Sequence, residues 1–389
     1  MEKNKGRASF TVFEAVKMRH PSLYLDWYVH VPPVKYDFRS SGLMRFKFDL
    51  NLGKTDLSVN HHHGNPETAR VLAQMYHVKS ENVFISVEGA SGQNARLIRY
   101  LAEKNSKKTE AIVEYPTYEP LLRQVEDHFR SVKILERKER EAYRLDADLL
   151  KKIVSEKTGL LVLTNSHAPS GAIADKTELK EIMNVASECG FYVLCDEVYA
   201  EFDRKRVPTL FSINSGYGIA TTSFTKAYGL GGLKLGVALT NKQLVDELYE
   251  DVLNTVGNSP NIVQAVATEL LTKGKEALEK HKQKWMPLKK ETEKWLDKKN
   301  FDYFPNKAGV TYWIKLPIKD TYKWVNKQAI PHNSLAAVPG TFFLFKNNHK
   351  LETSNMIRLG LGNINPDTSS LTQALTALEK NIYISKKAY

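Results

Sequence analysis

The chain has 389 residues, of which 42% are hydrophobic and 26% are charged, with 56 Lys and Arg against 44 Asp and Glu and a net charge of +12. The ordinary apolar content excludes an intrinsically disordered chain, and the sequence has no apolar run of the roughly 18 residues that a membrane-spanning helix needs. Cys189 and Cys195 are the two cysteines, which excludes a disulfide scaffold and a cysteine-rich zinc module, and without a signal-peptide core at the start we expect a soluble cytoplasmic protein.

The first 48 residues are rich in aromatic residues and arginine and show no clear alternation, so we expect an arm that packs on a smaller domain or on a partner subunit. From residue 82 onward, short apolar runs alternate with helical patterns. Near-continuous apolar strands separated by helices are typical of a mostly parallel sheet with helical crossovers, which predicts an α/β fold. The predicted strands are 82–87, 110–115, 131–136, 159–165, 191–197, 218–224 and 233–239, and the predicted helices are 92–104, 118–129, 145–154, 176–190, 241–254 and 260–273.

Residues 273–300 are strongly basic, with ten Lys against five Asp or Glu, which accounts for +5 of the net +12. Their apolar residues recur at helical spacing, which predicts an amphipathic helix with a solvated lysine face. The rest of the chain predicts a smaller α+β domain with strands at 309–317, 335–343 and 356–362 and a closing helix at 367–383. We therefore expect an arm at 1–48, a large domain at 49–283 and a small domain at 284–389.

Three patterns in the sequence fall short of the functions that they suggest. The basic segment lacks the alternation of Arg and aromatic residues found on a base-stacking surface, and no zinc-finger, basic-zipper or RNP signature is present. Gly53 and Lys54 resemble the end of a phosphate-binding loop, but Phe48 stands where such a loop needs a glycine. The three histidines at 61–63 lack a carboxylate or thiol partner at ligand spacing, so we expect no metal site.

Acidic, basic and glycine-rich groups follow the predicted strands. Asp196 lies at the end of the strand 191–197, and Lys226 directly follows the strand 218–224. Residues 89–92 (GASG) join a strand to a helix, where backbone N–H groups at the helix N-terminus form a cradle for an anion. Because α/β sheets bind ligands at the carboxyl ends of their strands, we expect these groups to share one site.

The order and spacing of these motifs resemble those of the fold-type I pyridoxal-phosphate enzymes, in the class I/II aminotransferase family (aspartate aminotransferase-like), across roughly residues 50–389. The matching motifs are GASG at 89–92, YPTY at 115–118, TNSHAPSG at 164–171, DEVY at 196–199, SFTK at 223–226, LGGLKLG at 230–236, VPGT at 338–341 and IRL at 357–359. The resemblance implies the fold of that family, pyridoxal 5'-phosphate as the cofactor, and a homodimer with shared active sites.

The resemblance also implies a role for each residue around the cofactor ring. Lys226 would form a Schiff base with the cofactor and then act as the general base that moves the substrate α-proton. Asp196 would pair with the pyridine nitrogen and keep it protonated, which maintains the electron sink. Tyr199 would donate a hydrogen bond to the ring phenolate, and Tyr118 would stack on the ring face.

Further residues would hold the cofactor phosphate and the substrate, if the resemblance extends to them. The residues expected at the phosphate are Ala90, Ser91, Gly92, Ser223 and Lys234. Arg358 would bind the substrate α-carboxylate as a bidentate pair, and Gly53 would lie where the family's backbone closes over the substrate.

Three positions depart from the family pattern. Ala168 replaces the Asn that normally donates a second hydrogen bond to the ring phenolate, which leaves Tyr199 as the family-type donor unless His167 or water substitutes. Lys234 replaces the usual Arg, which exchanges a bidentate fork for a point charge. His63 stands near the place of a tyrosine that reaches the neighbouring subunit's phosphate, and it would either take that role or lie in a plain loop.

We therefore expect an aminotransferase that moves an amino group from an amino acid to a 2-oxo acid through the Lys226 Schiff base and a pyridoxamine intermediate. A lyase, decarboxylase or cyclising synthase on the same fold is an alternative, because the fold alone does not fix the reaction. A non-enzymatic basic protein that binds nucleic acid is a more remote alternative, against which Lys226 and Asp196 argue. The expected partners are small-molecule substrates and a second copy of the chain, with neither nucleic acid nor membrane.

Overall fold

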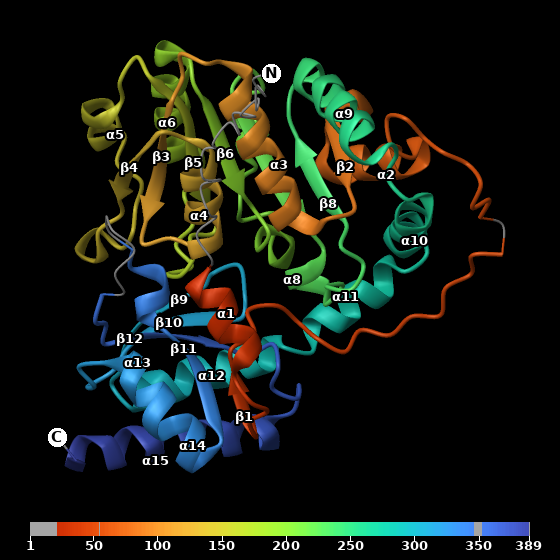
Figure 1. Ribbon diagram of the computed structural model, residues 1–389. Coiled ribbons are helices and arrows are strands. Elements are labelled where there is room, and N and C mark those ends of the chain that lie inside the picture. Colours follow the sequence, from red (N-terminus) through yellow and green to blue (C-terminus); the bar gives the residue numbers. More distant parts are fainter. Residues whose placement is uncertain (1–21, 54, 346–351, 389) are drawn as a thin grey trace, which may run out of the picture.

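The structure, a computed structural model, describes residues 22–53, 55–345 and 352–388. Two sheets organise these residues, one of seven strands and one of five, and helices pack around both (Figure 1). The seven-stranded sheet occupies the upper half of Figure 1 and the five-stranded sheet the lower half. This architecture confirms the α/β class expected from the sequence.

The seven-stranded sheet is mostly parallel and has the order β2-β8-β7-β6-β5-β3-β4. Its strands are β2 (Val83–Ser86), β3 (Glu110–Tyr115), β4 (Ser131–Glu136), β5 (Thr158–Thr164), β6 (Tyr192–Asp196), β7 (Gly218–Ser223) and β8 (Gly236–Leu239). β8 is antiparallel to β2 and β7, whereas the other neighbours run parallel. Successive side chains of β3 pack on opposite faces of the sheet, since Ile112 belongs to one apolar cluster and Val113 to another. The sheet is therefore covered on both faces.

Helices connect these strands, and their ends follow local sequence signals. They are α2 (Pro66–Tyr76), α3 (Gly89–Lys104), α4 (Glu119–His128), α5 (Ala147–Ile153), α6 (Lys176–Cys189), α7 (Leu210–Ile213), α8 (Thr225–Tyr228), α9 (Lys242–Val256) and α10 (Asn261–Thr272), with the short turns η1 (Ser80–Asn82), η2 (Glu139–Glu141) and η3 (Ala200–Phe202). In α6, Asp175 and Glu178 form a capping box, and Gly190 ends the helix with a φ of +65°.

The five-stranded sheet combines strands from both ends of the chain in the order β1-β11-β12-β10-β9. Its strands are β1 (Tyr36–Phe38), β9 (Asp302–Pro305), β10 (Thr311–Lys315), β11 (Leu335–Pro339) and β12 (Met356–Gly360). The remaining helices are α1 (Leu23–His30), α11 (Lys275–Gln283), α12 (Met286–Lys298), α13 (Thr321–Trp324), η4 (Val325–Ala329), α14 (Ile330–Asn333), η5 (Gly340–Phe343) and α15 (Thr368–Ala388). β1 pairs in parallel with β11, so residues 36–38 of the N-terminal arm form an edge strand of this sheet. Within the described ranges, no helix is both long enough and apolar enough to cross a membrane.

The basic segment at 273–300 differs from the single solvated helix expected from its periodicity. α11 ends at Gln283, and α12 begins at Met286 with Pro287 in its first turn. Proline lacks the N–H that would continue the α11 ladder, and it is tolerated only at the start of a helix. The expectation of a solvated lysine face is also wrong in part, because Lys282 is 8% exposed.

Candidate active site

A cavity of about 380 Å³ opens at the carboxyl ends of β5, β6 and β7. Thr164, Asp196 and Ser223 close these three strands and line it. Arg358 of β12 and Tyr24 of α1 line the opposite side, so the cavity lies between the two sheets. This is the edge at which parallel α/β sheets bind ligands.

Most of the residues singled out in the sequence line this one cavity. They are Ala90, Ser91, Tyr118, Asp196, Tyr199, Ser223, Lys226, Lys234 and Arg358. The cavity is therefore lined by a buried carboxylate, a half-buried amine and a buried guanidinium at once.

Gly92, His63 and Gly53 do not line the cavity of their own chain. Gly92 faces a neighbouring cavity on the other side of the α3 N-terminus. The His63 ring packs 5.2 Å from the Tyr249 ring, measured between centroids. Gly53 is exposed in the extended segment between β1 and α2, where its amide approaches the Asn51 side chain at 3.4 Å.

Asp196 is held at the end of β6 by groups that the sequence did not single out. Asn94 Nδ2 donates to its carboxylate at 2.8 Å, and the Val198 amide donates at 3.0 Å. Thr221 Oγ1 donates to Asn94 Oδ1 at 2.6 Å, which fixes the amide so that its NH₂ points at Asp196. Burial raises the pKa of Asp196 to about 6, although these donors and Lys226 favour the charged form.

Lys226 lies in the first turn of α8, directly after β7. Burial lowers the pKa of its amine, with a further lowering from Arg358 and Lys234. The arm packs closely here, because the Leu43 amide donates to the Lys226 carbonyl at 2.8 Å. A Cβ at Gly42 would lie 3.0 Å from Lys226 Cα, so a side chain at this position would crowd Lys226. The amine therefore loses its proton more easily than an ordinary lysine does.

Arg358 is buried and has free hydrogen-bonding capacity. Its Nη2 donates to the Tyr24 hydroxyl and to the Arg39 carbonyl, each at 3.0 Å. Its Nε is buried without a hydrogen-bond partner in the described part of the chain. Since buried donors are normally satisfied, this orphaned N–H marks a place for an acceptor such as a carboxylate.

The turn between β2 and α3 provides unpaired backbone donors. Glu88 precedes the helix without capping it through a side-chain hydrogen bond, so the N–H groups that follow Gly89 in the first turn of α3 stay available. The Gly89 amide donates to the Lys234 carbonyl at 2.6 Å, which brings Lys234 beside this turn. Helix N-termini carry partial positive charge, so the turn, Ser223 and Lys234 together suit a phosphate.

His167 is unable to replace the missing asparagine at position 168. Its Nδ1 pairs with Ser170 Oγ at 2.7 Å and its Nε2 with the Pro116 carbonyl at 2.9 Å, so both ring nitrogens are occupied. Ala168 itself lines the cavity, where it presents a methyl group in place of an amide donor.

The sequence motifs missed Asn94, Thr221, Tyr24 and Gly42. Thr221 carried a signal, since it is a polar residue two positions before Ser223 on a predicted buried strand and therefore shares its face. Tyr24 and Gly42 carried none, because the arm lacks a periodic pattern that would place it on the site.

The chain matches the family described as "Aminotransferase class I and II" over residues 45–378. It is 24% identical to a histidinol-phosphate aminotransferase of Methanococcus aeolicus over 183 residues, which covers 47% of this chain and 48% of that protein. It is 27% identical to an aspartate aminotransferase of Pyrococcus horikoshii over 211 residues, which covers 50% of this chain and 51% of that protein. The match thus spans about half the length of these curated relatives.

Solved structures share the fold over nearly the whole chain. A PLP-dependent aminotransferase from Streptococcus suis superposes with a TM-score of 0.81 at 23% identity, covering 94% of this chain and 98% of that one. An aspartate aminotransferase mutant from Thermus thermophilus gives a TM-score of 0.79 at 16% identity, covering 95% of this chain and all of that one (100%).

Proposed function

The chain belongs to the class I and II aminotransferase family, and from this premise we propose that it is a pyridoxal-phosphate-dependent aminotransferase that moves an amino group from an amino acid to a 2-oxo acid. The observation that supports this most strongly is the convergence of Lys226, Asp196 and Arg358 on one buried cavity. An amine, a carboxylate and a guanidinium so placed supply a proton-transfer group, an anchor for a ring nitrogen and a binding group for a carboxylate.

The cavity fits this cofactor at both of its ends. The uncapped N-terminus of α3, Ser223 and Lys234 suit the phosphate. At the other end, the Asp196 carboxylate suits the pyridine nitrogen, and Asn94 fixes its orientation. When bound, the cofactor withdraws electron density from the substrate α-carbon, which makes the α-proton acidic.

Side chains of the protein carry out the remaining steps of proton transfer and substrate binding. The Lys226 amine removes the proton from the substrate α-carbon, a role that its lowered pKa favours because more of the amine is neutral at physiological pH. The Asp196 carboxylate holds a proton on the ring nitrogen. Arg358 binds the substrate α-carboxylate, with its orphaned Nε available for one of the two bonds. Tyr118 and Tyr199 line the walls and exclude water.

We also propose that two copies of the chain form a cytoplasmic homodimer, with parts bounded at 1–48, 49–283 and 284–389. The chain that leads from the arm to α2 supports a dimer, since residues 49–53 and 55–65 loop outward beyond α10 (Figure 1). Leu50, Leu57 and Val59 of this segment are exposed, as are Leu253 and Val256 of α9. Exposed apolar residues of this kind indicate a surface that another chain covers. His63 lies on the same segment, where it would serve the phosphate site of the partner.

A half-reaction tests the proposed activity. Purified protein loaded with pyridoxal phosphate is incubated with each of the twenty amino acids and no acceptor, and the products are identified by mass spectrometry. We expect one equivalent of the 2-oxo acid per subunit from at least one amino acid, and none from Lys226→Ala. Multiple turnovers with release of carbon dioxide, ammonia or a cyclic product would instead establish a lyase, decarboxylase or synthase. If the protein failed to bind pyridoxal phosphate, both the aminotransferase and the alternative pyridoxal-phosphate-dependent reactions would be overturned.

A further inference from the structure

A carboxylate stands at the mouth of the phosphate-binding turn. Glu88 immediately precedes α3 and lines the cavity together with Gly89, Ala90 and Ser91. The turn suits an anion, but a phosphate there carries nearly two negative charges and would be repelled by a carboxylate beside it. Something must therefore direct the Glu88 charge away from the phosphate.

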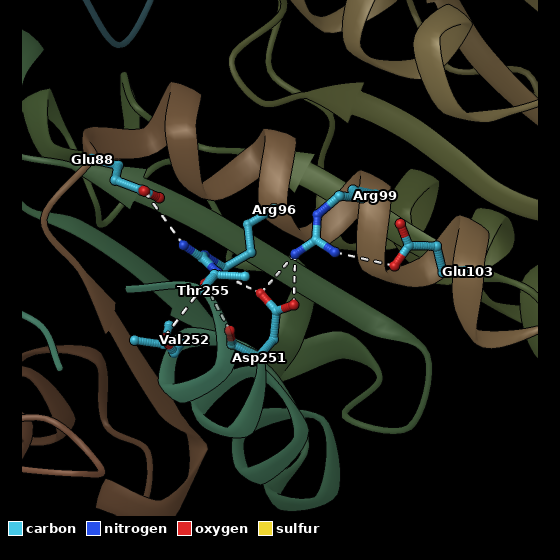
Figure 2. A network of polar contacts seen from close by, with 7 residues as sticks. All are labelled: Glu88, Arg96, Arg99, Glu103, Asp251, Val252 and Thr255. Carbon is cyan, nitrogen blue, oxygen red and sulfur yellow. Dashed lines mark hydrogen bonds and ion pairs between the residues drawn. The ribbon is translucent and has the colours of Figure 1, made fainter. Parts of the chain in front are cut away.

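Arg96 is placed to do this. It lies two turns further along α3 and reaches back to Glu88, with Nη2 at 3.4 Å from Glu88 Oε1 (Figure 2). Its other terminal nitrogen bonds the Asp251 carboxylate and, at 3.1 Å, the Thr255 hydroxyl of α9. Arg99 holds the same Asp251 through two bonds, at 2.6 and 2.8 Å. Arg96 is thus fixed from the α9 side and is 10% exposed at its side chain.

Gly92 makes this arrangement sterically possible. A Cβ at position 92 would lie 2.3 Å from Glu88 Cβ, which is a clash. The absent side chain lets Glu88 fold back over the first turn of α3 toward Arg96. The position of Glu88 therefore explains why residue 92 is a glycine, independently of any contact between Gly92 and the phosphate.

Lys234 is the cation that a released Glu88 would neutralise. It lines the same cavity, and a Cβ at Gly89 would lie 3.7 Å from Lys234 Cδ. The Lys234 ammonium has no ion-pair partner among residues 22–53, 55–345 and 352–388, so it is free to bind an anion. Since a lysine offers a point charge rather than a bidentate fork, pairing with Glu88 would remove most of its value at the phosphate.

We propose that Arg96 is a positioning residue that holds the Glu88 carboxylate away from the phosphate-binding turn and thereby keeps Lys234 available for the cofactor phosphate. This inference rests on the proposed function, because it takes pyridoxal phosphate as the ligand. Arg96 acts only through Glu88, so replacing Arg96 should no longer change the affinity for pyridoxal phosphate once the Glu88 charge is removed.

The test is a pair of variants and their combination, assayed by the dissociation constant of pyridoxal phosphate from the full-length protein in a fluorescence titration. Arg96→Met is expected to weaken binding about tenfold, as one misplaced charge beside a phosphate does. Glu88→Gln added to Arg96→Met is expected to restore the wild-type constant within about twofold. Arg99→Met is the matched control, since Arg99 contacts Asp251 and Glu103 but not Glu88.

Pyridoxal, which lacks the phosphate, provides a second readout. Its binding is expected to be equal in the wild type and in Arg96→Met. An unchanged constant for pyridoxal phosphate in Arg96→Met, or a loss that Glu88→Gln does not rescue, would overturn the inference while leaving the proposed function intact. If Arg96→Met does not fold, the single variant Glu88→Gln is the test. Weaker binding of pyridoxal phosphate by Glu88→Gln would show that the Glu88 charge does not oppose the phosphate, and it would overturn the inference. A wild-type protein that binds no pyridoxal phosphate would overturn the proposed function itself.

Discussion

Asp196 occupies a position where its own charge is unfavourable in the absence of a cationic ring. Its raised pKa of about 6, against an ordinary value of 3.8, means that the folded apoprotein binds this proton more tightly than the unfolded chain does. The stability gained from that proton is present below about pH 4 and is lost as the pH rises through about 6. We expect the stability of the Asp196→Asn apoprotein relative to wild type to be higher at pH 8 than at pH 4 by up to about 3 kcal/mol, because only the wild type loses its stabilising proton over this range. The amide NH₂ of the variant faces the Asn94 or the Val198 donor, and this cost is the same at both pH values.

Urea unfolding of the cofactor-free proteins at both pH values measures this difference. The same variant is expected to bind pyridoxal phosphate more weakly, since the ring nitrogen loses its ionic partner. Asp148→Asn serves as the control, because Asp148 is 84% exposed at its side chain and has only a distant lysine, at 3.8 Å. A stability difference that is the same at pH 4 and pH 8 would contradict the titration of Asp196.

Tyr24 is a positioning residue for Arg358. Its hydroxyl accepts a hydrogen bond from Arg358 Nη2 at 3.0 Å, so Tyr24→Phe leaves one of the two Nη2 hydrogens without a partner, while the other still bonds the Arg39 carbonyl. We expect KM for the amino acid to rise about fivefold in Tyr24→Phe, while the dissociation constant of pyridoxal phosphate stays unchanged. Tyr28→Phe on the same helix is the control, since Tyr28 contributes its backbone carbonyl to the Arg39 side chain. Equal KM values in the two variants would remove Tyr24 from substrate binding.

The motifs predicted a set of residues that the structure gathers in one cavity, because strand ends of a parallel sheet meet at one edge. The residues that orient them could not be predicted in the same way. Asn94 meets Asp196 across 102 positions of the sequence, and Tyr24 meets Arg358 across 334. Such pairs depend on how helices pack on the sheets, which no local spacing encodes.

At the scale of elements, one buried carboxylate on α4 binds the N-terminus of α1. Glu119, in the first turn of α4, accepts from the Ser22 hydroxyl at 3.0 Å, the Leu23 amide at 3.0 Å and the Tyr24 amide at 2.6 Å. Arg123 Nε donates to the same carboxylate at 3.0 Å. Negative charge at a helix N-terminus is stabilising, and Glu119 supplies it to α1 from another element.

Replacing Glu119 by Gln is expected to release α1, because the amide NH₂ of glutamine faces donors where the carboxylate offered acceptors. We expect faster proteolysis in the segment that follows α1 and a higher KM for every amino acid by a similar factor, with cofactor affinity unchanged. Limited proteolysis and steady-state kinetics measure these effects. Glu126→Gln is the control, since Glu126 bonds Arg123 on the same helix. Wild-type proteolysis of Glu119→Gln would show that α1 is held by other contacts.

The predicted elements between residues 82 and 239 agree with the observed strands and helices, because apolar periodicity there coincides with real crossovers. The basic segment was less predictable. Its helical spacing continues through Pro287, but the chain has to turn from one sheet to the other, and the proline permits a new helix to begin. β1 and α1 gave no signal, since their apolar residues are partnered by distant elements rather than by a periodic face.

At the scale of the whole molecule, only some of the basic residues behind the net charge of +12 lie on a solvated surface. Part of the lysine excess on α11 stabilises the packing of this helix against the segments that follow β6 and β7. Lys282 Nζ donates to the Glu201 carbonyl at 3.1 Å and to Glu279 Oε1 at 3.0 Å. Its ammonium also lies 5.4 Å from the centroid of the Tyr228 ring in α8. These contacts connect α11 to η3 and to the helix that carries Lys226.

Lys282 is therefore expected to matter for stability in a way that its neighbours do not. Lys282→Met keeps most of the aliphatic stem but leaves the Glu201 carbonyl and the Tyr228 ring without their cation, so the free energy of unfolding should fall by about 1–3 kcal/mol. Lys290→Met, at an exposed position of α12, removes the same charge and should change it by less than about 0.5 kcal/mol. Urea unfolding of both variants separates the two contributions. Equal losses would mean that the basic charge acts through the overall field, whereas a loss confined to Lys282 means that it acts through its buried contacts with η3 and α8.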